Sequence, residues 1–291
     1  MLLLSGCEQT TEPSYRPTFS TTPPITDTVY HFGVHPLHNP QKLYAVFSPL
    51  TDYLSEQIPG VRFKLEASRN YAAYDKKLYA GEFHFSLPNP FQTINAIDKG
   101  YRVFAKMGDD TNFRGIILVR KDSGISRVSD LKGRKVSYPA PTALAATMMP
   151  QYYLQTNGVD VMKDLDNRYV GSQESSIMNV YLKQTAAGAT WPPPWIALAK
   201  QRPELEEELS VIWKTDSLIN NSLVVLPVVP KAIVQQVHDL LVNLHKHEPG
   251  REILRPMELS RFETAENQSY DVVRQFIDNF TQKVRPVGGA G

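Results

Sequence analysis

One stretch organises this chain of 291 residues: Val136-Ser137-Tyr138-Pro139-Ala140-Pro141-Thr142-Ala143-Leu144-Ala145-Ala146-Thr147. It predicts a short strand, a proline-rich turn, and a helix over residues 142–156 with Thr142 as its N-cap. The N–H groups at a helix start have no partner within the helix and carry a partial positive charge. Such a turn is a candidate anion site, although taken alone it is equally an ordinary capped turn.

The same pattern returns further along the chain. A predicted strand ends at Tyr169-Val170, and Gly171-Ser172-Gln173-Glu174 opens a second helix over residues 174–187. Two strand-to-helix turns in one α/β lobe can converge on one ligand, so the pair favours an anion site. Glu174 has two interpretations: it pairs with a ligand amine, or it simply favours the helix dipole. The candidate binding residues of the two turns are Thr142, Ala143, Ser172, Gln173 and Glu174.

The composition is that of a globular protein, with 42% hydrophobic and 21% charged residues. The net charge of +1 provides no basic field for nucleic acid, so we expect no nucleic-acid partner. Cys7 is the one cysteine, which excludes a disulfide within the chain and a cysteine-rich metal site. The length suits one large domain or two lobes.

The surroundings of Cys7 indicate lipid attachment. Residues 1–7 are a short apolar run followed by Ser, Gly and Cys, which resembles the lipobox of a bacterial lipoprotein signal peptide, although no basic segment precedes it. A chance cysteine is the alternative. We expect residues 1–7 to be a signal-peptide remnant, Cys7 to carry a lipid that anchors the protein to a membrane, and residues 8–27, rich in Thr, Pro and Ser, to form a flexible tether.

From residue 28 onward, predicted strands and helices alternate, which favours an α/β fold with a mainly parallel sheet. Four motifs in this order then carry a family resemblance: Gly33-Val34-His35-Pro36, the run Ala67-Ser68-Arg69-Asn70-Tyr71-Ala72-Ala73, the run Val119-Arg120-Lys121-Asp122-Ser123-Gly124-Ile125, and Asp130-Leu131-Lys132-Gly133. Residues 29–247 are thereby similar to the phosphonate/phosphite-binding lipoproteins of ABC importers.

The resemblance implies a two-lobe, type II periplasmic-binding-protein fold with the ligand in the cleft between the lobes. Two crossing segments, near residues 113–120 and 213–222, would form the hinge. The expected division is residues 28–117 with 214–285 for the first lobe, 118–213 for the second, and 286–291 for a disordered tail.

This chain departs from the family pattern at the binding loops. Ala140-Pro141-Thr142-Ala143 stands where the family usually has Ser-Thr-Ser, and Gln173-Glu174 stands where it tends to have His and Asp. Arg69-Asn70-Tyr71 replaces an Asp and Tyr pair, and Pro88-Asn89-Pro90-Phe91 replaces a Gly-Pro-aromatic loop. We therefore expect a ligand that is larger or less charged than phosphite. The resemblance adds Arg69, Asn70, Tyr71, Asn89 and Phe91 as candidate binding residues.

Arginine, tryptophan and histidine side chains are further candidates for the binding site. Arg69 is either a bidentate clamp for a phosphonate or carboxylate, or a solvated surface residue. Trp191 precedes three prolines and Trp195, and we expect Trp191 to form an aromatic wall of the cleft while Trp195 packs at the lobe edge. His31, His35 and His38 are too loosely spaced to favour a metal site, so we expect no metal.

The sequence has no Gly-x-Ser-x-Gly, no Walker loop and no dinucleotide fingerprint. We therefore expect a protein without enzymatic activity or cofactor: a monomeric, lipid-anchored protein of the periplasm or cell envelope that binds a small anionic or zwitterionic ligand and delivers it to an ABC transporter permease. A ligand-sensing module for a membrane signalling partner is the alternative, and an enzyme on the same fold is a weaker one.

Overall fold

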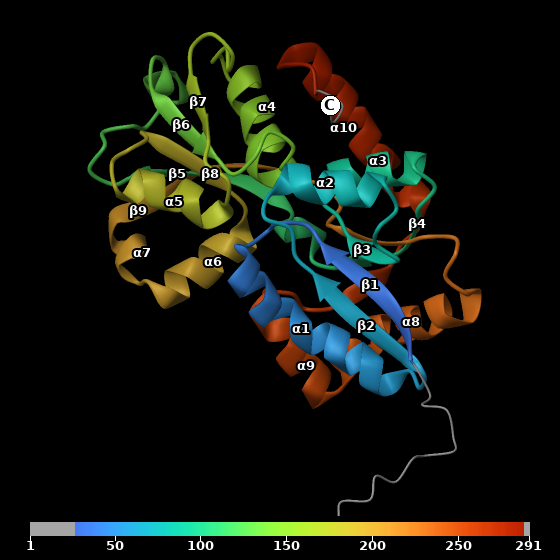
Figure 1. The fold of residues 1–291 in the computed structure, drawn as a ribbon. Helices are drawn as coiled ribbons and strands as arrows, with labels where there is room; N and C mark the ends of the chain where they lie inside the picture. Colours follow the sequence, from blue (N-terminus) through green and yellow to red (C-terminus); the bar gives the residue numbers. More distant parts are fainter. Residues whose placement is uncertain (1–26, 288–291) are drawn as a thin grey trace, which may run out of the picture.

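The computed structural model describes residues 27–287 and contains two mixed β-sheets, each covered by helices (Figure 1). No helix among these residues has the length and apolar character needed to cross a bilayer. The two-lobe α/β fold expected from the sequence is confirmed. The sheets, however, are mixed rather than mainly parallel, because strands that return from the other lobe pair antiparallel with their neighbours. Cys7 and most of the expected tether lie outside the described residues.

The first lobe is built on a six-stranded sheet with the order β11-β4-β10-β3-β1-β2. Its strands are β1 (Thr28–Val34), β2 (Val61–Glu66), β3 (Phe85–Leu87), β4 (Arg102–Met107), β10 (Ser222–Val225) and β11 (Phe262–Thr264). Its helices are α1 (Pro40–Gln57), α2 (Tyr71–Tyr79), α3 (Pro90–Asp98), α8 (Lys231–Asn243), α9 (Glu248–Leu254) and α10 (Asp271–Lys283).

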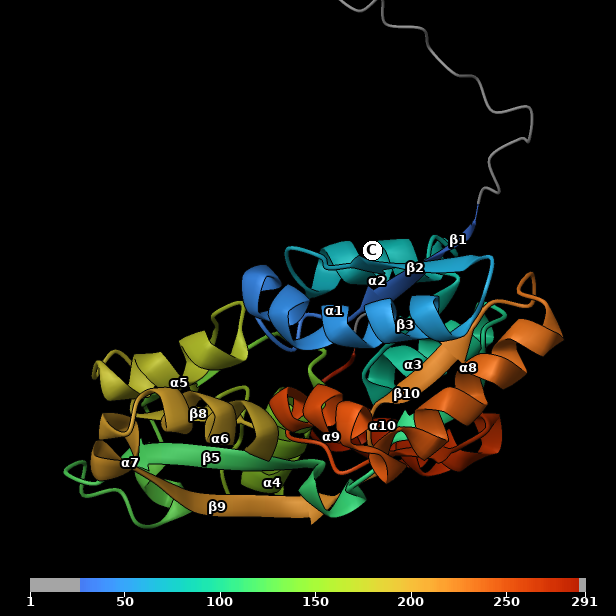
Figure 2. The same ribbon diagram turned by 90° about the horizontal axis from the view of Figure 1, so that it is seen from below.

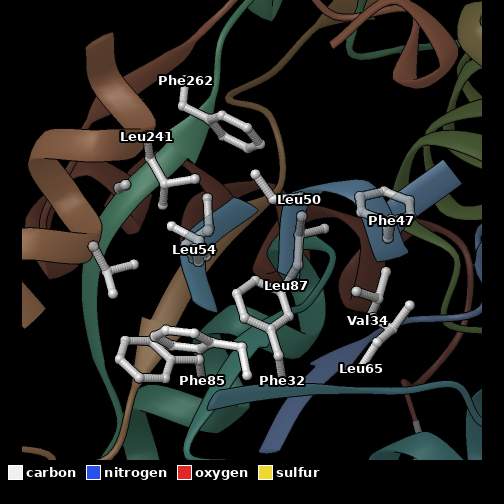
Figure 3. Packing of buried hydrophobic residues seen from close by; sticks show 14 of the residues in the cluster. Phe32, Val34, Phe47, Leu50, Leu54, Leu65, Phe85, Leu87, Leu241 and Phe262 are labelled. Carbon is white, nitrogen blue, oxygen red and sulfur yellow. The ribbon is translucent and has the colours of Figure 1, made fainter. Parts of the chain in front are cut away.

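The core of the first lobe lies between this sheet and α1, α8 and α9. Apolar side chains alternate along β1 and β2 and recur on one face of α1, so both elements bury one face against the other. Figure 3 shows Phe32 and Phe85 of the sheet packed beneath Leu50 and Leu54 of α1. Pro49 lies inside α1 without dividing it, so α1 remains one helix that leads away from the cleft.

The second lobe is built on a five-stranded sheet with the order β7-β6-β8-β5-β9. Its strands are β5 (Arg114–Arg120), β6 (Lys135–Tyr138), β7 (Asp166–Tyr169), β8 (Ala187–Thr190) and β9 (Leu209–Ser217). Its helical segments are a π-helical turn (Leu144–Met148) that continues into α4 (Met149–Thr156), then α5 (Gln173–Tyr181), α6 (Pro192–Gln201) and α7 (Glu204–Glu208). Figure 2 shows this lobe beside the first, with α5 and α6 on one side of β5.

The chain crosses between the lobes from β4 to β5 and from β9 to β10. The expected boundaries at residues 117 and 213 fall inside β5 and β9, which belong wholly to the five-stranded sheet. The two crossings lie side by side, because Leu218 N donates to Phe113 O at 3.0 Å and Asn220 Nδ2 donates to Gly108 O at 2.7 Å. This pairing forms the hinge side of the cleft.

A third contact joins the lobes after α10, which lies beside α4 (Figure 1). Arg285 donates from Nη2 to Pro141 O at 2.7 Å and from Nε to Gln151 Oε1 at 3.2 Å. Val284, at the end of the expected first lobe, and Val287, in the expected tail, both pack against the hydrophobic cluster shared by both lobes.

Candidate functional site

A small cavity lies where the two lobes meet. Its free volume is about 10 Å³, roughly the space of one water molecule, so the lobes are closed against each other. The first lobe and the crossings provide polar and aromatic groups, and the second lobe provides the π-helical turn with two further side chains. The lining residues are His35, Tyr71, Asn89, Phe113, Ala143, Leu144, Ala145, Ala146, Gln173, Trp191 and Asn221.

The first predicted anion turn reaches this cavity, but not through Thr142. Ala143 is the N-cap residue, it has no side-chain cap bond, and the first turn is π-helical. The prediction of a Thr142 cap is wrong. Pro150 provides a physical reason: it has no N–H for the carbonyl of Ala146, which disfavours a regular α-helical turn before it. Thr142 contributes its backbone instead, since its carbonyl accepts from Asn89 Nδ2 across the cleft at 3.2 Å.

The π-helical turn lies against strand β5 at Gly115. A Cβ atom built at Gly115 would meet Ala145 O at 2.7 Å and Pro150 at 2.6 Å, so only glycine allows this approach. The first N–H groups of a helical segment have no partner within it. Leu144, Ala145 and Ala146 line the cavity, and they therefore bring backbone donors with a partial positive charge to its wall.

The second predicted turn places one side chain in the cavity. Ser172 caps α5 by accepting from Ser175 N at 3.1 Å, as expected from the sequence, and its hydroxyl donates to Ser175 Oγ at 2.9 Å. Ser172 is not among the lining residues. Gln173, the first residue of α5, is buried on the cavity wall, where its Oε1 accepts from Thr190 Oγ1 at 2.8 Å.

Glu174 does not line the cavity and bonds across the lobes instead. His38 Nδ1 lies 3.1 Å from Glu174 Oε1, and Lys42 Nζ lies 3.7 Å from the same oxygen. Burial disfavours ionisation of Glu174, but the hydrogen bond and charge of His38 outweigh it and hold the pKa of the carboxyl below its ordinary value. Glu174 is therefore an ionised contact between lobes in this closed state.

The first lobe contributes His35 and Tyr71, both of which are buried. His35 donates from Nδ1 to Leu87 O at 2.9 Å, which leaves its second ring nitrogen as an acceptor in the neutral form. Burial lowers the pKa of His35 to about 4, although the bond to Leu87 opposes this. Burial likewise raises the pKa of the Tyr71 hydroxyl, while a hydrogen bond with Gln173 opposes it. Both side chains are uncharged at neutral pH.

Asn89 and Asn221 complete the polar wall. Asn89 caps α3 through a capping box with Gln92, and its Nδ2 holds Thr142 O. Asn221 lies on the crossing between β9 and β10 and is 1% exposed. Its Nδ2 faces Met107 Sδ at 3.5 Å, and its Oδ1 is buried with no hydrogen-bond partner among residues 27–287.

Two aromatic rings form the apolar wall. Trp191 is 3% exposed and meets Phe113 edge to face, with 5.6 Å between ring centroids. Trp195 instead packs against a separate cluster of the second lobe. The cavity thus has polar groups on the side of the first lobe and flat rings beside the hinge.

Several sequence candidates lie elsewhere. Arg69 is exposed and outside the cavity. Asn70 is exposed and caps α2 by accepting from Ala73 N at 2.9 Å. Phe91 is buried in the cluster shared by both lobes without lining the cavity. The sequence reasoning missed His35, Phe113 and Asn221 as cavity residues. His35 lay within a quoted motif, but the other two belong to crossings whose meeting is visible only in three dimensions.

The groups that line this cavity are suited to binding a small molecule. The described residues that line it carry no formal charge at neutral pH, and they offer backbone N–H donors, amide groups and aromatic faces. No group of three His, Cys, Asp or Glu side chains within residues 27–287 is arranged to hold a metal ion. Such a site can orient a small polar molecule between two lobes.

Comparisons with known proteins agree with this geometry. Residues 32–270 match the family model described as ABC transporter, phosphonate, periplasmic substrate-binding protein. The chain is 23% identical over 197 residues to the probable ABC transporter phosphite binding protein PhnD1 of Prochlorococcus marinus (strain MIT 9301), covering 63% of this chain and 65% of that protein. It is 19% identical over 253 residues to the phosphonates-binding periplasmic protein of Escherichia coli (strain K12), covering 84% and 75%.

The fold is also similar to solved structures. The structure of PhnD1 from Prochlorococcus marinus (MIT 9301) in complex with methylphosphonate superposes with a TM-score of 0.80 at 20% identity, covering 87% of this chain and 98% of that one. This likeness shows the two-lobe fold. The sequence match to the same protein spans just under two thirds of its length.

Proposed function

Because the chain belongs to the family of periplasmic substrate-binding proteins of phosphonate ABC transporters, we propose that it captures a small phosphonate-like oxyanion between its lobes and presents it to an ABC importer permease. Members of this family are substrate-binding components of transporters rather than enzymes. The observation that carries the proposal is the position of the π-helical turn. Its free N–H groups form one wall of a buried cavity that both lobes line.

The small size of the cavity means that the lobes open before a ligand enters. A free volume of about 10 Å³ is too small for a phosphonate, so the lobes separate for the ligand to enter and close again around it. Hinge closure around a ligand is a common mode for two-lobe proteins. The paired crossings at Phe113 and Leu218 supply the hinge, and contacts such as that between Asn89 and Thr142 form on closure.

The cavity wall supports a ligand of low charge. No Arg or Lys side chain among the described residues lines it, and Arg69 is exposed. The turn N–H groups together supply the equivalent of roughly half a positive charge. We therefore propose that Tyr71, Asn89, Gln173 and the backbone from Ala143 bind the ligand, with Trp191 packed against its apolar part.

A thermal-shift panel tests this function. Phosphonates, phosphate esters, sulfonates and carboxylates are each added in excess to the purified protein. A ligand present at 100 times its dissociation constant stabilises the folded state by about 2.7 kcal/mol, which raises the melting temperature by several degrees. We expect the largest rise with small phosphonates. A rise with carboxylates alone would reject the proposal.

We also propose that the protein is a lipid-anchored monomer of the periplasm or cell envelope. The position of Cys7 directly after a short apolar run supports this. The substitution Cys7→Ser in the full-length chain should move the protein from the membrane fraction to the wash. Retention of the variant in the membrane after a salt wash would reject the anchor.

A further inference from the structure

Asn221 is a cavity residue with a side-chain hydrogen-bond acceptor that has no partner among the described residues of the closed structure. Its backbone is fixed, because Asn221 O accepts from Met107 N at 2.8 Å and Asn221 N donates to Asn220 Oδ1 at 2.7 Å. Its side chain lines the cavity, and Oδ1 is buried without a partner among the residues the structure describes. A buried acceptor without a partner costs free energy, and a ligand that donates a hydrogen there recovers it.

A second acceptor lies on the same wall. Neutral His35 donates its one ring N–H to Leu87 O, so its other ring nitrogen can only accept a hydrogen bond. One group of each neighbouring amide is already engaged, since Asn89 Nδ2 donates to Thr142 O and Gln173 Oε1 accepts from Thr190 Oγ1. Asn221 and His35 therefore place acceptors on this wall, while the donors come from the backbone of the turn and from the Tyr71 hydroxyl.

The charges around the cavity also favour a ligand of low charge. The charged groups on the surrounding elements are engaged with other partners and do not line the cavity. These are Glu174 with His38 and Lys42, Asp75 with Gln92, Asp110 with Lys106 and the backbone of Asn220, and Arg285 with Pro141 O. A dianion would be buried against roughly half a positive charge, whereas a monoanion comes close to balance.

We propose that the cavity binds the singly charged, protonated form of its oxyanion, and that the hydroxyl of this ligand donates its hydrogen to Asn221 Oδ1. The inference rests on the proposed function and adds the protonation state that the site selects. The oxyanion oxygens accept from the N–H groups of Leu144, Ala145 and Ala146. The acidic hydroxyl faces the opposite wall, where Asn221 accepts.

Calorimetry with methylphosphonate from pH 6.5 to 9 tests the selection. Across this range His35 is neutral, the Tyr71 hydroxyl keeps its proton, and Glu174 is ionised. Burial raises the pKa of Asp75 to about 6, so this carboxyl completes its ionisation at the lower end of the range and the ligand is the main group that titrates above pH 7. The association constant should be constant below the second pKa of methylphosphonate and should fall about tenfold per pH unit above it. An affinity that is constant or that rises through this pKa overturns the proposal, a rise meaning that Asn221 presents its amide N–H.

Methanesulfonate supplies the matched ligand. It has the same shape and a single negative charge, but it has no hydroxyl hydrogen to donate. At pH 6.5 it should bind at least tenfold more weakly than methylphosphonate. Equal binding would overturn the proposal while leaving the oxyanion-binding function intact. Failure of both ligands to bind would reject the proposed function together with the inference.

The substitution Asn221→Ala separates recognition from structural support. It should reduce the preference for methylphosphonate over methanesulfonate to less than threefold, because the acceptor is lost. Asn220→Ala is the control, since Asn220 lies next in the same crossing and holds Gly108 O without lining the cavity. Equal weakening of both ligands in Asn221→Ala would mean a purely structural role. If this variant does not fold, the pH series on the unmodified protein decides alone.

Discussion

His38 and Glu174 join the two lobes across the mouth of the cleft, with 3.1 Å between His38 Nδ1 and Glu174 Oε1. His38 follows β1 of the first lobe, and Glu174 lies in the first turn of α5 in the second. Lys42 of α1 lies 3.7 Å from the same carboxylate oxygen. These contacts exist only while the lobes are closed, so they should stabilise the ligand-bound state.

The substitution Glu174→Ala should weaken ligand binding about tenfold, because a hydrogen bond to a charged group contributes roughly 1.5–3 kcal/mol to the closed state. Calorimetry with methylphosphonate measures the loss. Glu204→Ala is the matched control, since Glu204 begins α7, pairs with Arg202, and does not line the cavity. Equal affinities for the two variants would contradict a role of Glu174 in closure.

Closure should weaken as the solution is acidified. Burial lowers the pKa of His38 from 6.5, although its bond to Glu174 opposes this. The pKa of Glu174 also lies below its ordinary value of 4.5, because His38 and Lys42 outweigh the effect of burial. The closed state therefore disfavours protonation of both groups, so its stability is complete above about pH 6.5 and is lost as the pH falls through the lowered values.

Fluorescence energy transfer between the lobes measures this effect. Dyes on Lys64→Cys and Lys163→Cys, both exposed and one in each lobe, report the separation in a Cys7→Ser chain. Transfer at saturating methylphosphonate should fall between pH 7 and pH 5. A His38→Gln and Glu174→Gln double variant should show a smaller pH response. An identical response in this variant would assign the effect to other groups.

The substitution Gly115→Ala should destabilise the second lobe and the binding turn together. Its Cβ would overlap Ala145 O and Pro150 at less than 3 Å, and overpacking of this kind typically costs 1–3 kcal/mol. We expect a lower free energy of unfolding in urea and a larger loss of ligand affinity than the loss of stability explains. Unchanged stability and affinity would mean that the turn does not depend on this close approach.

Trp191 should report ligand binding by fluorescence. It is buried on the cavity wall, whereas Trp195 packs in a separate cluster and Trp213 belongs to β9. Methylphosphonate should change the intrinsic emission, and Trp191→Phe should remove most of this change. Loss of the change in Trp195→Phe or Trp213→Phe instead would contradict the position given to Trp191.

Local sequence signals located the helix start at the second turn. Ser172 caps α5 within the stretch predicted to open a helix, because a cap depends on one side chain and the next three residues of backbone. Thr142 was mispredicted for an equally physical reason. The segment before Pro150 is π-helical and begins at Leu144, and this proline lies beyond the few residues from which an N-cap is predicted.

The composition of the cavity could not be predicted in the same way. Phe113 and Asn221 come from the two crossings, and their meeting depends on how β5 and β10 enter different sheets. The sequence left Glu174 with two interpretations, a partner for a ligand amine or a favourable charge for the helix dipole, but its partner His38 lies 136 positions away in the sequence. Arg69 lies exposed just before α2, and no local signal shows which way such a residue points.

Titration calorimetry with methylphosphonate on three forms of the protein measures whether the ligand binds in the cavity between the lobes. The forms are the unmodified chain, Ala145→Leu, whose added side chain fills the cavity, and Arg69→Ala, which changes an exposed candidate outside it. We expect one-to-one binding by the unmodified chain, the same affinity within about twofold for Arg69→Ala, and at least a hundredfold loss for Ala145→Leu. Undiminished binding by Ala145→Leu, or loss of binding in Arg69→Ala alone, would contradict a ligand site in the cavity between the lobes.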